Sequence, residues 1–144
     1  MRFILDTNVL SEELKPRPDR RVEAWLDGQP PEDLAISALS FGEIWAGILR
    51  LGHGHRRITL TRWLWSVLPH RYFGRIVPVD PAISLEWGKL TAEAKRRGRP
   101  IDVPDALLVA TARARKLTIV TRNVRHCGGW GADVINPWTD KASD

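Results

Sequence analysis

The sequence predicts an α/β fold in which a parallel sheet is covered by helices on both faces. Short apolar runs alternate with longer segments of helical periodicity along the whole chain. This alternation is typical of parallel strands joined by right-handed helical crossovers. The length of 144 residues suits one domain with a substantial core. The expected strands are Phe3–Leu5, Leu34–Ser37, Ile76–Val79, Thr118–Thr121 and Asp133–Ile135.

Several of the helical segments begin or end at recognisable signals. Ser40, followed three residues later by Glu43, fits a capping box in which each side chain bonds the other residue's backbone N–H. Asp80-Pro81 places proline at a helix entry, and Gly98 ends the same helix. Pro104 pushes the preceding residue out of the helical region, so the next helix begins at about Pro104. The expected helices are Arg20–Asp27, Ser40–Leu51, Thr59–Leu68, Ala82–Arg97 and Pro104–Lys116.

The composition, with 43% apolar and 27% charged residues, is that of a soluble globular protein. No apolar run approaches the roughly 20 residues of a membrane span, and Asp6 and Asn8 interrupt the N-terminal apolar run, which argues against a signal peptide. The single cysteine, Cys127, permits no internal disulfide. We therefore expect a cytoplasmic protein without membrane association, with one domain over residues 1–139 and a polar tail over residues 140–144.

Positive charge dominates the chain and is clustered. The formal net charge is +5. No Asp or Glu occurs between Ile44 and Val79, and a second basic stretch runs from Lys95 to Arg99. Because arginine pairs bidentately with phosphate, this clustering favours a polyanionic partner such as nucleic acid. A solvated surface, or a patch covered by an acidic protein, gives the same pattern.

Three acidic residues are expected at one edge of the sheet. Asp6 follows the strand Phe3–Leu5, and the carboxyl ends of parallel strands form the edge where ligands bind. Glu43 lies in the helix that follows the second strand, and Asp105 lies in the first turn of a buried helix. Each acid also has a local use: Asp6 as a helix cap, Glu43 in the capping box, and Asp105 at the positive end of a helix dipole.

Taken together, the three acids indicate a metal site. Clustered carboxylates repel one another, and Mg²⁺ or Mn²⁺ removes that penalty through hard oxygen ligands. A bound metal ion activates water and stabilises charge on a phosphoryl oxygen. With a basic surface, this combination predicts metal-dependent hydrolysis of phosphodiester bonds. A phosphatase with an aspartyl nucleophile at Asp6 is an alternative, but it expects a second Asp where Asn8 stands.

Four segments resemble the motifs of PIN-domain ribonucleases, and more narrowly those of the VapC and FitB toxins of bacterial toxin–antitoxin pairs. They are residues 3–12 (FILDTNVLSE), 105–112 (DALLVATA), 121–123 (TRN) and 135–138 (INPW). The resemblance implies a three-layer α/β/α PIN domain with a five-stranded parallel sheet, which cuts RNA with Mg²⁺ or Mn²⁺. It also implies a homodimer and a cognate, VapB-like DNA-binding antitoxin.

The same resemblance implies roles for individual residues. Asp6 and Asp105 match acids that bind the metal ion directly, and Glu43 matches one that binds it or positions the attacking water. Thr121 and Asn123 match polar residues beside the site, where Asn123 would orient a water or a ligand carboxylate. Attack in line on the phosphorus would leave a 5′-phosphate and a 3′-hydroxyl.

One position departs from the family pattern. Three residues beyond Asn123 the family usually has an acid, but this chain has His126. Imidazole is a poorer partner for Mg²⁺ than a carboxylate, so the change either removes a ligand or leaves a group that touches the metal or a phosphate. Asp102 is an extra acid that could compensate, although Pro104 separates its geometry from that of Asp105. The alternative function is a PIN-fold module that binds nucleic acid or an antitoxin with weak or no catalysis.

Overall fold

The computed structural model describes residues 1–140 and contains a five-stranded sheet with the strand order β3-β2-β1-β4-β5. All neighbouring strands are parallel, and the central strand places Leu5 between Ile36 and Val120. The predicted α/β class with a five-stranded parallel sheet is therefore confirmed. The strands are β1 (Phe3–Leu5), β2 (Leu34–Ser37), β3 (Ile76–Val77), β4 (Thr118–Val120) and β5 (Val134–Ile135).

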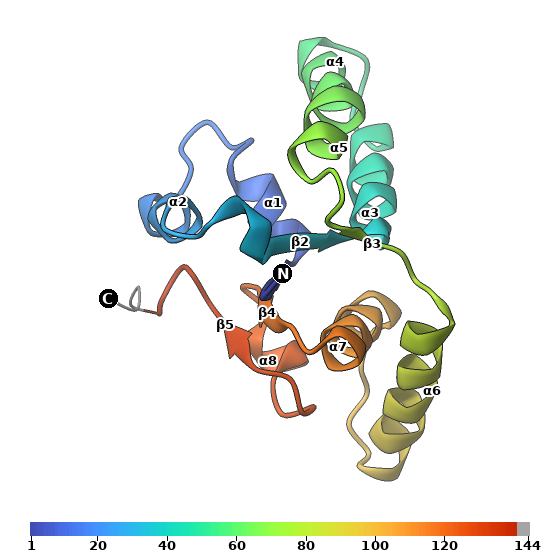
Figure 1. Ribbon diagram of the computed structural model, residues 1–144. Coiled ribbons are helices and arrows are strands. Elements are labelled where there is room, and N and C mark those ends of the chain that lie inside the picture. The colour runs from blue at the N-terminus through green and yellow to red at the C-terminus, as the bar shows by residue number, and fades with distance from the viewer. Residues whose placement is uncertain (141–144) are drawn as a thin grey trace.

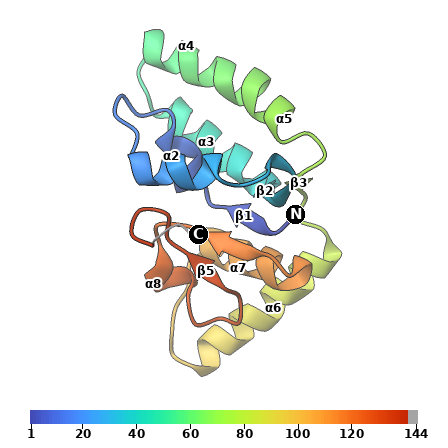
Figure 2. The ribbon, with the colours of Figure 1, turned by 60° about the vertical axis from the view of Figure 1, so that its left-hand side comes forward.

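Helices cover both faces of this sheet (Figures 1 and 2). The first layer contains α1 (Thr7–Glu12), α2 (Arg20–Asp27), α3 (Ala38–Leu49), α4 (His55–Arg62), the π-helix η2 (Trp63–Val67) and α5 (Leu68–Arg71). The second layer contains α6 (Pro81–Arg96), α7 (Val103–Arg115) and α8 (Val124–Cys127), and the short 3-10 helix η1 (Pro31–Asp33) leads into β2. The helices α3, α4, η2 and α5, which we call the arm, project from the sheet (Figure 1).

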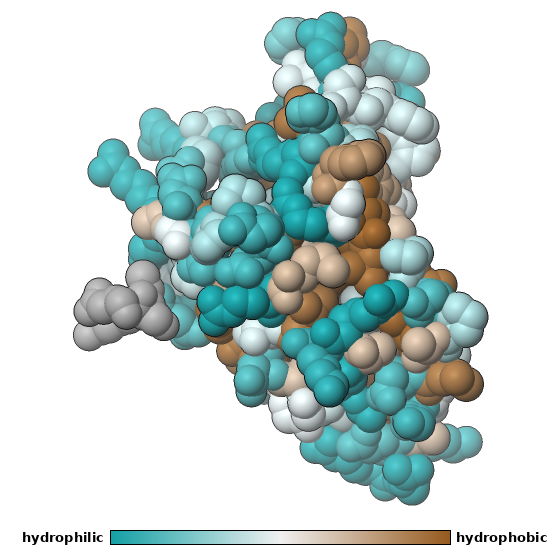
Figure 3. Space-filling view, in the orientation of Figure 1, coloured by the Kyte–Doolittle hydropathy of each residue, from teal (hydrophilic) through white to brown (hydrophobic). Residues whose placement is uncertain are grey.

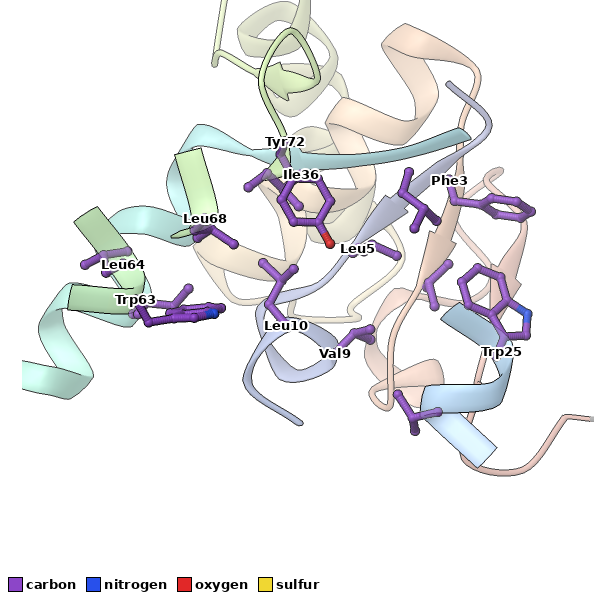
Figure 4. Packing of buried hydrophobic residues seen from close by; sticks show 14 of the residues in the cluster. Phe3, Leu5, Val9, Leu10, Trp25, Ile36, Trp63, Leu64, Leu68 and Tyr72 are labelled. Carbon is purple, nitrogen blue, oxygen red and sulfur yellow. The ribbon is translucent and has the colours of Figure 1, made fainter. Parts of the chain in front are cut away.

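Alternate residues of the strands pack into opposite layers. Phe3 and Leu5 join the cluster on the α1–α5 side, where the Phe3 ring meets Trp25 edge to face at 5.0 Å between centroids (Figure 4). Ile4, which lies between them in β1, joins the second cluster with Val109 of α7. Because the strands are buried on both faces, they read in the sequence as continuous apolar runs rather than as alternating patterns.

The start of α3 corrects one prediction. The capping box at Ser40 is wrong, because α3 begins at Ala38 and the Ser37 side chain caps it by accepting the N–H of Leu39 at 3.1 Å. Ser40 is instead buried inside the helix. Glu43 therefore lies beyond the first helical turn, and its side chain is not used in capping.

Other boundaries follow the expected signals more closely. Asp80 caps α6 by accepting the N–H of Ile83 at 2.9 Å, and Gly98 follows this helix with a φ of 59°, in the left-handed region that favours glycine. Helix α7 begins at Val103 rather than Pro104, and the expected helix Thr59–Leu68 is part of a longer run from His55 to Arg71. Helix α1 was not among the expected helices.

The expected polar tail is described in the structure only at its first residue, Asp140. Asp140 accepts the N–H of Asn136 at 2.8 Å, so this residue of the expected polar tail is tied to the loop before it. The rest of the expected tail, residues 141–144, lies outside the described residues. Within residues 1–140, no helix is long and apolar enough to cross a membrane.

Candidate active site

Asp6 lies at the carboxyl end of β1 and is held by three hydrogen-bond donors. Its Oδ1 accepts the backbone N–H of Thr7 at 2.7 Å. Its Oδ2 accepts the Thr121 hydroxyl at 2.7 Å and the Asn8 side-chain amide at 3.3 Å. Asp6 is also the N-cap residue of α1, so the capping role and the position at the sheet edge occur in the same side chain.

Thr121 organises the hydrogen bonds around this carboxylate. Its side chain is fully buried at the end of β4, with 0% exposed. The hydroxyl donates to Asp6 and accepts both the backbone N–H of Asn123 at 3.0 Å and the Asn8 amide at 3.3 Å. Since a hydroxyl offers one donor and two acceptor positions, all of them are used. Thr121 therefore fixes the orientation of the Asp6 carboxylate relative to the loop after β4.

Glu43 reaches the same edge from α3. Its Oε1 accepts the Thr7 hydroxyl at 3.0 Å, and that hydroxyl also lies 3.1 Å from Oγ of Ser40. A hydroxyl has only one proton, so Thr7 satisfies both contacts by donating to Glu43 and accepting from Ser40. Burial raises the pKa of Glu43, the bond from Thr7 lowers it, and the negative charges of Asp6 and Asp105 raise it further.

Asp105 completes the group of acids from the first turn of α7. Its side chain is 15% exposed, and its Oδ2 lies 3.5 Å from Nδ1 of His126, a side chain that is 61% exposed. Burial raises the pKa of Asp105, and the charges of Asp6 and Asp102 add to the rise while His126 opposes it. The structure thus places His126 in contact with Asp105, and Asp102 close enough for its charge to act on Asp105.

The three acids share one electrostatic environment. Burial also raises the pKa of Asp6, despite the opposing hydrogen bonds from Thr121 and Thr7. A cluster of acids whose pKa values are all raised is a common property of functional sites.

The acids alone do not enclose a metal ion. Within residues 1–140, no group of three or more His, Cys, Asp or Glu side chains is arranged to hold one by itself. The donor set nevertheless fits Mg²⁺, because this ion keeps several waters and takes one or two carboxylates rather than a complete protein cage.

Asn123 is the remaining predicted residue of the site, and two further residues of the hydrogen-bond network were missed by sequence reasoning. Asn123 is the exposed N-cap residue of α8, and its side chain forms no hydrogen bond within the described residues. Asn8 and Ser40 belong to the site network but were not among the predicted site residues. The sequence signal for Asn8 was its place in the run Asp6-Thr7-Asn8, directly after the expected strand Phe3–Leu5.

A three-layer α/β/α domain with acids gathered at the carboxyl edge of a parallel sheet defines a class of protein. Residues 3–127 match the PIN domain family. Toxin FitB from Neisseria gonorrhoeae is 37% identical over 139 residues, which cover 96% of this chain and 99% of that protein. VapC ribonuclease Y4jK from Sinorhizobium fredii is 40% identical over 137 residues, with 94% and 97% covered.

The similarity extends to a solved three-dimensional structure. A complex of FitAB bound to a DNA fragment matches with a TM-score of 0.90 at 32% identity, covering 96% of this chain and 97% of that one. The chain therefore belongs to the PIN-domain family and, within it, to the VapC and FitB ribonuclease toxins of toxin–antitoxin pairs. The resemblance found in the sequence motifs is confirmed.

Proposed function

We propose that this chain is a Mg²⁺- or Mn²⁺-dependent endoribonuclease that acts as the toxin of a type II toxin–antitoxin pair, through a single domain over residues 1–139. The observation that carries the proposal is the meeting of Asp6, Glu43 and Asp105, from three separate elements, with every pKa raised. A divalent cation would remove their mutual repulsion. RNA in the cytoplasm is the substrate that fits a nuclease site on a chain of net charge +5.

The residues of the site would divide the work by their burial and contacts. Asp6 and Asp105 are the more enclosed acids and would bind the metal ion. Glu43 is exposed and its pKa is raised; it would bind the ion or accept a proton from the attacking water. When bound, the ion would supply stabilisation of charge on phosphoryl oxygens and a lowered pKa of water. Asn123 and His126 would orient the water or contact the phosphate from α8.

The basic arm would hold the RNA backbone. Four of the arginines in the acid-free stretch have structural partners: Arg71 contacts Glu13 at 2.6 Å, and Arg56, Arg57 and Arg75 donate to backbone carbonyls. Arg50 and Arg62 are exposed, and neither forms an ion pair within residues 1–140. These two side chains are therefore the best candidates for phosphate contacts, which would make RNA binding sensitive to salt.

An apolar surface on the arm would receive the antitoxin. A cavity of about 290 Å³ opens between α3 and the η2–α5 segment, lined by aromatic and aliphatic side chains (Phe41, Gly42, Trp45, Leu64, Trp65 and Pro69). Trp65 is 66% exposed and meets Trp45 edge to face at 6.1 Å. Apolar side chains also gather near the arm on the face seen in Figure 3. Exposed aromatic surface of this kind marks protein interfaces, and the FitB relative is known in a complex with its antitoxin, FitA. We further propose that the toxin is a homodimer.

Binding of Mn²⁺ to the purified protein, measured by titration calorimetry, tests the metal site. We expect one site in the wild type, at least tenfold weaker binding in Asp105→Asn, and unchanged binding in the control Asp133→Asn, an exposed acid away from the site. Equal Mn²⁺ affinity in the wild type and Asp105→Asn would contradict the metal site. If the wild type is inactive on RNA while His126→Asp cleaves it, the chain is instead the catalytically weak binding module.

A further inference from the structure

A pocket outside the acidic site lies between α6, the loop of residues 97–102 and the start of α7. Its volume is about 460 Å³, and its walls include Trp87, Thr91, Lys95, Arg99, Val103 and Ala106. Most of the lining is apolar, and no Asp or Glu is part of it. A largely apolar pocket of a few hundred Å³ with a few polar groups is typical of a small-ligand site.

The polar groups of this pocket are mainly hydrogen-bond donors. The indole N–H of Trp87 is buried and has no hydrogen-bond partner within residues 1–140. Lys95 is exposed and forms no ion pair in the same part of the chain. A buried donor without an acceptor is unfavourable, so a ligand that brings an acceptor to the indole would gain affinity.

Arg99 supplies a second positive charge in a fixed position. Its guanidinium donates to the carbonyls of Arg125 at 2.9 Å and Gly128 at 2.8 Å, and it stacks on Trp130 at 4.4 Å from the ring centroid. These contacts hold the guanidinium in place before any ligand arrives. They also connect the wall of the pocket to α8, the helix that carries His126.

The pocket wall includes residues of the helical turn that carries Asp105. Val103 and Ala106 line it, and Asp105 lies between them in the first turn of α7. Consecutive Cα atoms are about 3.8 Å apart, so the pocket wall at Ala106 begins next to the Asp105 backbone. Neighbouring residues of a helix point in different directions, so a nucleotide that adjoins a phosphate at Asp105 would reach this pocket by passing around the start of α7.

We propose that this pocket binds one unpaired nucleotide of the RNA substrate, next to the phosphate that is cleaved. The inference rests on the proposed ribonuclease function and extends it by assigning a site that selects the base. The apolar walls would cover the faces of the base, and a base carbonyl would accept the Trp87 N–H after a small rotation of the indole. Lys95 would contact the adjoining phosphate. Proteins that read single-stranded RNA bind splayed-out bases in this manner.

The variant Trp87→Phe separates this role from a structural one, because it keeps an aromatic ring and removes the unpartnered N–H. If the N–H binds RNA, KM for a single-stranded RNA rises about three- to tenfold, the range expected for one neutral hydrogen bond. The thermal midpoint of the free protein stays the same or rises, because an unsatisfied donor has been removed. An unchanged KM would overturn the assignment of the indole.

Lys95→Met tests the phosphate contact, and Lys89→Met is its matched control on the same helix. Lys89 is exposed, pairs with Glu86 at 3.2 Å and is not part of the pocket wall. We expect Lys95→Met to raise KM about threefold or more and to reduce the salt dependence of RNA binding by about one phosphate contact. Equal effects of the two substitutions would show that only net charge matters, which contradicts the pocket.

Direct binding distinguishes a failure of the pocket from a failure of the nuclease function. The wild-type protein in EDTA is titrated with each ribonucleoside 5′-monophosphate while the Trp indole N–H signals are followed by NMR, with Trp87 assigned from the Trp87→Phe spectrum. The proposal expects the Trp87 signal to shift and to saturate with at least one nucleotide. If the protein cleaves RNA but this signal never moves, the pocket proposal is wrong and the nuclease proposal stands. If the signal moves but no RNA is cleaved with metal present, the nuclease proposal fails.

Discussion

Replacing Thr121 by valine tests how the structure orients Asp6. Valine fills nearly the same buried volume but removes the hydroxyl that donates to Asp6 Oδ2 at 2.7 Å. Hydrogen bonds to charged groups contribute about 1.5–3 kcal/mol, so the free energy of unfolding should fall by about that amount at neutral pH. At about 3 °C per kcal/mol for a chain of this size, the thermal midpoint should fall by roughly 5–9 °C.

The pH dependence of this loss follows from the charge of Asp6. The Thr121 bond favours the ionised carboxylate and lowers the pKa of Asp6, although burial raises that pKa overall. Stability from this bond is therefore fully present above the pKa of Asp6 and is lost as the pH falls through it. Thermal unfolding of the wild type and Thr121→Val in EDTA, followed by circular dichroism at several pH values, should show a difference that shrinks toward acid pH.

Thr111→Val is the matched control for this experiment. Thr111 is also buried, with 1% exposed, but its hydroxyl donates to the uncharged carbonyl of Leu107 at 2.7 Å. We expect a loss of stability of about 1 kcal/mol or less that does not vary with pH. If Thr121→Val loses no more stability than Thr111→Val, or loses the same amount at every pH, the proposed role of Thr121 is refuted.

Three further predictions concern the acids, the arm and the basic surface. In Glu43→Gln, RNA cleavage should fall about 10²-fold or more. The thermal midpoint of the metal-free protein should stay the same or rise, because repulsion from Asp6 and Asp105 is relieved. A large loss of stability in this variant would argue for a structural role of Glu43. Trp65→Ala should weaken antitoxin binding at least tenfold in a pull-down titration, and Leu85→Ala, also exposed, should not. Arg62→Met should lower RNA affinity at low salt and reduce the salt slope by about one contact, and an unchanged slope would exclude it from the RNA surface.

The sequence predicted the fold well because burial dominates it. The strands β1 and β2 are enclosed on both faces, so their apolar runs are distinct from the helices between them. Strand ends were less predictable. Thr121 was expected in the fourth strand and lies just beyond β4, although its N–H still donates to Ile135 at 3.0 Å. Such a residue continues the ladder of hydrogen bonds without belonging to the strand.

The candidate site was predictable in its acids but not in the network around them. Asp6 and Asp105 follow from their places at a strand end and in the first turn of a helix, whereas Glu43 lies in the middle of α3. The capping box at Ser40 failed because Ser37 is an equally good capping residue, and Ser40 is buried against Thr7, which is 33 positions away. The contact between Asn8 and Thr121 spans 113 positions. No local pattern in the sequence encodes contacts of this range, since only the folded sheet brings these residues together.

Cleavage of RNA by Asp6→Asn, compared with the wild type at several concentrations of Mg²⁺ and Mn²⁺, is the most direct test of the acidic metal site. We expect wild-type cleavage to require the metal and to stop in EDTA. We expect Asp6→Asn, which keeps the shape of the side chain but loses its charge, to cleave at least about 10²-fold more slowly at every metal concentration. Cleavage by Asp6→Asn at the wild-type metal-dependent rate would contradict a role for Asp6 in binding the metal ion.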